Sequence, residues 1–83
     1  GSQKTAVVEG DISFSDGNTT ITAARGSFNW STKDAVFEGT VLINADASLF
    51  TGTTQNLLNY KNECGQITTN KIIYNVRTKK FHD

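Results

Sequence analysis

The chain has 83 residues and carries eight positive and eight negative side chains, so its formal net charge at pH 7 is zero. That balance argues against nucleic acid as a partner, because binding nucleic acid requires a basic surface that neutralises phosphates. The length predicts one domain with a thin core, and the single cysteine, Cys64, excludes an internal disulfide or a thiolate metal cluster.

The first two residues, Gly1-Ser2, are typical of the scar that a protease leaves when an expression tag is removed. We therefore expect a single domain over residues 3–83. The chain also does not begin with methionine. We therefore expect the domain to be a fragment of a longer protein.

The first predicted strand covers residues 5–14. Small or apolar residues, ending in Ile12 and Phe14, occupy every second position, and polar residues such as Glu9 and Ser13 occupy the others. This period of two is typical of a strand with one buried face. Residues 15–18 follow as a turn, because Asp, Gly and Asn adopt the positive φ of tight hairpins.

The next predicted strand, residues 19–31, is long and contains Arg25-Gly26 near its middle. A glycine inside a strand pattern indicates a bulge or a sharp bend. We expect the strand to turn a corner there, with equivalent corners at Gly52 and Asn70. Residues 31–34 then form a polar turn.

The clearest strand covers residues 35–43, and it repeats an upstream segment. Phe37-Glu-Gly-Thr-Val-Leu-Ile43 matches Val8-Glu-Gly-Asp-Ile-Ser-Phe14 at an offset of 29 residues, from Glu9 to Glu38. A fixed internal period indicates a stacked supersecondary unit.

Residues 49–59 and 66–74 follow with related patterns and are predicted strands, and Lys80-Phe81 begins another after a turn at residues 75–79. No segment has apolar residues at helical spacing. The nearest is residues 53–61, with only Leu57, Leu58 and Tyr60. We therefore expect an all-β chain.

Strands that recur every 12 to 16 residues and bend at a small residue predict an antiparallel repeat ladder. The bends would fold it into a V or a flattened barrel, with apolar side chains between its two faces. A stack of this kind leaves open edge strands at both ends.

These segments resemble the OstA-like family of periplasmic lipopolysaccharide-transport proteins, which includes LptA and LptC. The resemblance rests on Val-x-Gly-x-Ile-x-Phe, Ile-Thr-Ala and Phe-x-Trp, and again on Phe-Glu-Gly-Thr-Val-x-Ile, Phe-Thr-Gly and Leu-x-Tyr, and it spans nearly all of residues 6–81. It implies a β-jellyroll, or "β-taco", whose groove carries lipid acyl chains. It also implies a periplasmic location, possible attachment to the inner membrane, and edge-to-edge stacking with related domains or with further copies of the chain.

A trough between the two faces would be lined by the apolar residues of the inward phase. These lipid-groove candidates are Ile12, Phe14, Ile21, Phe28, Trp30, Phe37, Val41, Ile43, Phe50, Leu58, Tyr60, Ile72 and Tyr74. Burial of an acyl chain among them would be favourable at about 25 cal/mol per Å². The same residues are also what the core of a small β domain requires, and both interpretations stay open.

Three aromatic residues, Trp30, Tyr60 and Tyr74, occupy matching places in the copies. They would either line the groove mouth or form a cross-strand stack that closes the core. Basic residues follow in the turns and would either contact lipid phosphates or be solvated: Lys33, Lys61, Arg77, Lys79 and Lys80.

No constellation of residues indicates catalysis, a metal site or a cofactor. Glu9 and Glu38 lie on different strands with no His or Asp near them in the pattern. We expect His82, next to Asp83, to be solvated and without partner ligands, and Cys64 to lack a base.

The leading hypothesis is a non-enzymatic periplasmic module that shields the acyl chains of lipopolysaccharide or another lipid. The alternative is a structural β-solenoid, bactofilin-like or adhesin-like, without a lipid ligand. Parallel rungs would favour the alternative, and an antiparallel ladder the hypothesis.

Overall fold

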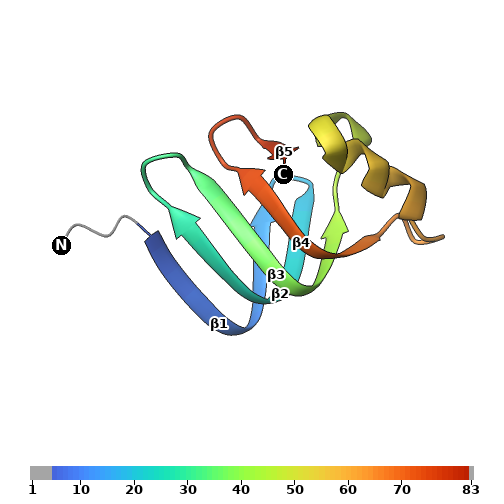
Figure 1. Cartoon of the computed structure of the whole chain (residues 1–83). Coiled ribbons are helices and arrows are strands. Elements are labelled where there is room, and N and C mark those ends of the chain that lie inside the picture. The colour runs from blue at the N-terminus through green and yellow to red at the C-terminus, as the bar shows by residue number, and fades with distance from the viewer. Residues whose placement is uncertain (1–4, 83) are drawn as a thin grey trace.

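The computed structural model describes residues 5–82 and confirms an all-β fold: five strands form one open antiparallel sheet, in the order of the chain (Figure 1). The expectation for Gly1-Ser2 lies outside the described residues. The strands are β1 (Thr5–Asp16), β2 (Thr19–Asn29), β3 (Asp34–Asn44), β4 (Ile67–Asn75) and β5 (Lys80–His82). Two 3₁₀ segments, η1 (Ala47–Leu49) and η2 (Gly52–Tyr60), lie between β3 and β4.

The sheet is bent along one line that crosses four strands. The pairing slips once between each of the neighbours β1 to β4, at Gly10, Ala24, residues 39–40 and Asn70. Extra residues of this kind bend a strand and increase its twist. The strands therefore curve into a V at this line (Figure 1).

The bend divides the sheet into two arms. The first arm consists of residues 5–9, 25–29, 34–38 and 71–75, with β5 beside it. The second arm consists of residues 12–16, 19–22, 41–44 and 67–69.

The corner predicted at Arg25-Gly26 is misplaced, because both residues pair regularly with β3. The bend in β2 lies one or two residues earlier, at Ala24. Gly26 is required for packing: a Cβ there would lie 2.7 Å from Ile12 Cδ1. The corner predicted at Asn70 is confirmed, whereas Gly52 begins η2 and bends no strand.

The bend in β3 depends on two residues in the left-handed region. Gly39 has φ +80° and Thr40 has φ +47°. Gly39 is constrained twice, since a Cβ would also lie 2.8 Å from the Ala24 Cβ. A β-branched residue with positive φ is strained, so Thr40 holds its conformation at a cost in stability.

Two hairpin turns share one conformation and show the internal period in space. In each, an asparagine side chain, Asn29 or Asn75, accepts hydrogen bonds from the backbone N–H groups two and three residues on, at 2.9 to 3.0 Å. Each turn closes at a lysine with positive φ, Lys33 at +65° and Lys79 at +60°. The second turn also contacts the first, because Asn75 Nδ2 donates to the Thr32 carbonyl at 2.9 Å.

The strand predicted over residues 49–59 is wrong, because most of that segment is helical. Phe50 and Thr51 remain extended, and Phe50 forms a bridge to Phe81. The segment lacks β-branched apolar residues at alternate positions, and the Thr54 hydroxyl hydrogen-bonds the Thr51 carbonyl in the first turn of η2. η2 packs beside β4 and β5, at the far end of the ladder from β1 (Figure 1).

The core extends from β2 to β5, and its largest buried side chains lie at the β4 and β5 end of the V. Phe50 stacks on Phe81 with ring centroids 4.5 Å apart, and Phe81 contacts Tyr74 at 4.9 Å. All three side chains are fully buried. The Thr51 N–H donates to the Phe81 carbonyl at 3.1 Å, so the predicted open edge is partly covered at this end. At the other end, β1 pairs only with β2 among the described residues.

Replacing Thr40 by asparagine tests the strain at the bend. Asparagine tolerates the left-handed region better than threonine, so Thr40→Asn is expected to stabilise the protein by about 0.5–1 kcal/mol in urea unfolding. Thr68→Asn, at an exposed position in regular β4, is the matched control and is expected to destabilise through lower strand propensity. Equal destabilisation by both substitutions would contradict strain at Thr40.

Candidate functional site

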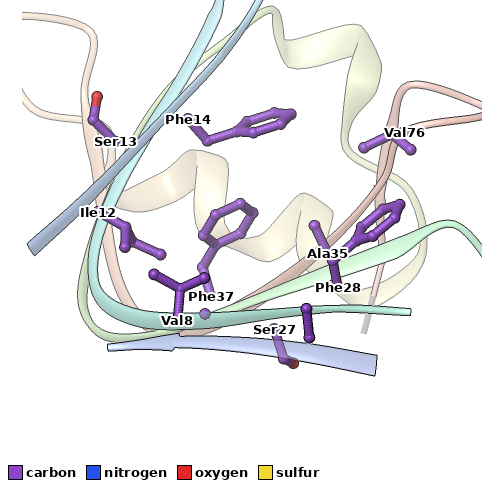
Figure 2. Close-up of a pocket in the computed structure, with 11 residues that line it drawn as sticks. Val8, Ile12, Ser13, Phe14, Ser27, Phe28, Ala35, Phe37 and Val76 are labelled. Carbon is purple, nitrogen blue, oxygen red and sulfur yellow. The ribbon is translucent and has the colours of Figure 1, made fainter. Parts of the chain in front are cut away.

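A pocket of about 500 Å³ lies between the two arms at the β1 end of the V (Figure 2). β1, β2, β3 and the turn after β4 supply its walls, which are almost wholly apolar. The lining residues are Ala6, Val8, Ile12, Ser13, Phe14, Gly26, Ser27, Phe28, Ala35, Phe37 and Val76. The volume is within the range of 300–1,000 Å³ that is usual for small-molecule sites.

Phe14, in the second arm, reaches across the V to the first arm. Its ring centroid lies 5.6 Å from that of Phe37 and 5.6 Å from that of Tyr74, both in the first arm. Figure 2 shows Phe14 opposite Phe37, with Val76 to one side. Phe14 thus forms one wall of the pocket while it also contacts the core.

Four of the predicted groove residues line this pocket: Ile12, Phe14, Phe28 and Phe37. Sequence reasoning did not assign Ala6, Val8, Ala35 or Val76 to the groove, although Ala6 and Val8 share the alternating phase of Ile12 and carried a usable signal.

The other predicted groove residues lie elsewhere. Five are buried in the closed core, with at most 2 % of their surface exposed: Ile21, Val41, Ile43, Phe50 and Tyr74. Ile72 is buried beside a second pocket of about 310 Å³, between β4 and η2. Leu58 lies on η2 and packs partly buried against the core. The set therefore divides between a packed core and an open pocket.

The three aromatic residues at matching repeat positions do not come together. Trp30 is 49 % exposed and packs edge-on against Phe28, with centroids 6.1 Å apart. Tyr60 lies on η2 and is 71 % exposed, whereas Tyr74 is buried. Neither a shared groove mouth nor a cross-strand stack of the three forms, because η2 interrupts the repeat.

His82 was expected to be solvated, and its side chain is only partly so, at 37 % exposed. Its Nε2 atom lies 2.9 Å from Asp34 Oδ1, and Asn75 Nδ2 donates to the same oxygen at 2.8 Å. Burial raises the pKa of Asp34, but these hydrogen bonds outweigh it and place the pKa below its usual 3.8. The three groups join β3, β4 and β5 on the first arm.

The other candidate polar residues are on the surface. Glu38 forms an exposed ion pair with Arg25 at 3.4 Å, and Cys64 is exposed. Within residues 5–82 no three His, Cys, Asp or Glu side chains gather in a way that could hold a metal ion. Lys33, Lys61 and Arg77 are also exposed.

Asp16 joins the tips of the two arms. It accepts a hydrogen bond from the Tyr74 hydroxyl at 2.9 Å and from Lys79 Nζ at 2.8 Å. The hydrogen bond from Lys79, together with that from Tyr74, holds the pKa of Asp16 below its usual value. Burial, with the Asp16 carboxylate beside it, raises the pKa of Tyr74 to about 12. We call these three residues the clasp.

Comparisons of the chain with protein-family models, curated proteins and solved structures gave no match. Among the residues that the structure describes, no helix has the length and apolar character to cross a membrane.

The raised pKa of Tyr74 predicts a loss of stability in alkaline solution. A pKa that is higher in the folded chain stabilises the fold fully below the ordinary tyrosine value of 10. That contribution, on the order of 1–2 kcal/mol, is lost as the pH rises from 10 towards 12. Urea unfolding across this range is expected to show a steeper decline for the unmodified chain than for Tyr74→Phe. Parallel curves would show that Tyr74 ionises as readily when folded as when unfolded.

Proposed function

We propose that the chain is a non-enzymatic lipid-binding module of the cell envelope, which shields acyl chains in the pocket between its arms. The observation that carries this proposal is the pocket of about 500 Å³, with almost wholly apolar walls that β1 helps to form. An alkyl chain gains about 0.8 kcal/mol for each methylene group that it buries in such walls. No polar group in the pocket is arranged for chemistry.

Lipopolysaccharide is the proposed lipid, and the periplasm the proposed location, because the strand motifs resemble the OstA-like family. Two exposed basic residues, Lys33 and Arg77, lie in the neighbouring turns of the first arm, and Val76 of the second turn lines the pocket. Lys33 and Arg77 are therefore suited to contact the phosphate groups of a lipid whose acyl chains enter the pocket.

The unpaired side of β1 supports the second part of the proposal, which is pairing with related β-jellyroll domains. An edge strand presents unpaired backbone N–H and C=O groups, and another strand can add to it. The antiparallel ladder also argues against the β-solenoid alternative, whose rungs would run parallel.

Two neighbouring valines of β1 provide a matched test of lipid binding. Val8 lines the pocket and Val7 does not, although both are exposed, at 53 % and 67 %. A photo-crosslinking phenylalanine analogue in place of Val8 is expected to capture purified lipopolysaccharide, and the same analogue in place of Val7 is not. Val8→Glu is expected to weaken binding about tenfold, because a carboxylate would be desolvated beside the acyl chain, while Val7→Glu leaves it unchanged.

The possible outcomes distinguish a wrong choice of lipid from a wrong choice of binding site. Capture of phospholipid but not lipopolysaccharide at position 8 would retain a lipid-binding module and reject lipopolysaccharide as its ligand. Equal labelling at both positions, or none at position 8 in a folded protein, would refute the pocket as the lipid site.

A further inference from the structure

The second half of β1 is connected to the opposite arm through all three of its inward-facing side chains. Ile12 and Phe14 line the pocket, and Asp16 belongs to the clasp. They occupy alternate positions after the bend, so they share one face of the strand. Contacts across the V therefore follow this segment from the bend to its tip.

The same segment, residues 12–16, pairs with β2 along its length, and among the described residues this is its only strand pairing. The pairing of β1 with β2 is interrupted between Glu9 and Ile12. Gly10 has φ +86°, and a Cβ at this position would meet no atom within 4 Å. Residues 12–16 are thus joined to the first half of β1 by an uncrowded, unpaired glycine, which is a suitable hinge.

The clasp and the pocket are built from the same two segments. Phe14, which forms a wall of the pocket, is two residues from Asp16 on β1. Val76, which lines the pocket on the opposite side, is in the turn that ends at Lys79. Movement of Asp16 away from Lys79 and Tyr74 would carry Phe14 away from Phe37 and widen the pocket.

We propose that residues 12–16 are a flap over the pocket and that the clasp is its latch. This inference rests on the proposed function, since it describes how an apolar ligand enters and leaves the same site. The Lys79 side chain is 61 % exposed, and an ion pair in such surroundings is weak. A weak latch allows the flap to open by thermal motion and still keeps it closed most of the time.

The latch is tested by the rates at which a small apolar probe enters and leaves the pocket. N-phenyl-1-naphthylamine is suitable because it is uncharged, so changes in protein charge do not attract or repel it. In stopped-flow fluorescence, Asp16→Asn and Lys79→Gln are expected to raise both the association and the dissociation rate about three- to tenfold. A three- to tenfold change in rate corresponds to the small free energy that one exposed ion pair and one hydrogen bond contribute. The dissociation constant is expected to change less than either rate.

Lys61→Gln is the matched control. Lys61 is exposed at the end of η2 and belongs neither to the pocket lining nor to the clasp, and the substitution makes the same change in net charge as Lys79→Gln. It is expected to leave both rates at the values of the unmodified protein. Because Lys79→Gln retains both Asp16 and its bond to Tyr74, it is the milder variant and keeps the test valid if Asp16→Asn folds poorly.

Amide hydrogen exchange gives a second readout that does not need a ligand. The amides of residues 12–16 are expected to exchange faster in Asp16→Asn and Lys79→Gln than in Lys61→Gln. Faster exchange with unchanged probe rates would overturn the proposal, because the segment would open without controlling the pocket. Unchanged exchange in both clasp variants would overturn it as well. If the unmodified protein takes up neither the probe nor lipid, the proposed function fails, and the exchange data alone decide whether the clasp holds the segment closed.

Discussion

The structure depends on the line of irregular residues that lets one sheet fold onto itself. A sheet of five strands has an apolar face that must be covered, and a chain of 83 residues has little else with which to cover it. The bulges at Gly10 and residues 39–40 solve this by turning the second arm over the first. The two inner faces then form a core between parts of the same strands. The left-handed conformation of Gly39 and Thr40 is therefore a condition for having a core at all.

The two ends of this folded sheet are filled differently, and the pocket is the consequence. At the β4 end, Phe50 and Phe81 stack inside the V and η2 packs beside them. At the β1 end the lining residues include Ala6 and Ala35, whose small side chains leave the space between the arms empty. The contrast comes from side-chain volume along one continuous fold. An internal repeat with uniform residues would have produced either a full core or a full-length trough.

The sequence alone predicted the strands in which apolar and polar residues alternate strictly. It did not predict the role of a residue type, such as glycine, that can serve either packing or bending. The repeat around Glu9 and Glu38 located β1 and β3, but the bends at Gly10 and at residues 39–40 were not predicted. Gly26 was mistaken for a corner because a glycine that permits close packing looks the same in a sequence as one that permits a bend. Continuing the period predicts a strand over residues 49–59, and the helical segment that lies there, η2, has too few apolar residues to reveal itself by pattern.

The candidate site was predictable only in part, because the sequence pattern shows which residues face inward but not what lies opposite them. Period two identified inward-facing residues, and Phe14, Phe28 and Phe37 do face the space between the arms. The pattern did not distinguish residues with a partner opposite them, such as Ile43, from residues facing an empty space, such as Val8. That distinction depends on which elements pack against each end of the V. The clasp was hidden for the same reason, since Asp16 and Lys79 are 63 positions apart and meet only because the arms close.

The unpaired edge of β1 links the two proposals made above. A strand that added to this edge would give residues 12–16 a second set of backbone hydrogen bonds, on the side where the described residues leave them unpaired. Those bonds would oppose any movement of the flap, whatever the state of the clasp. Pairing with another domain and admission of a ligand therefore compete for the same segment. A domain with a partner on β1 would retain its ligand longer than one without, and the strength of the clasp would matter most when the edge is free.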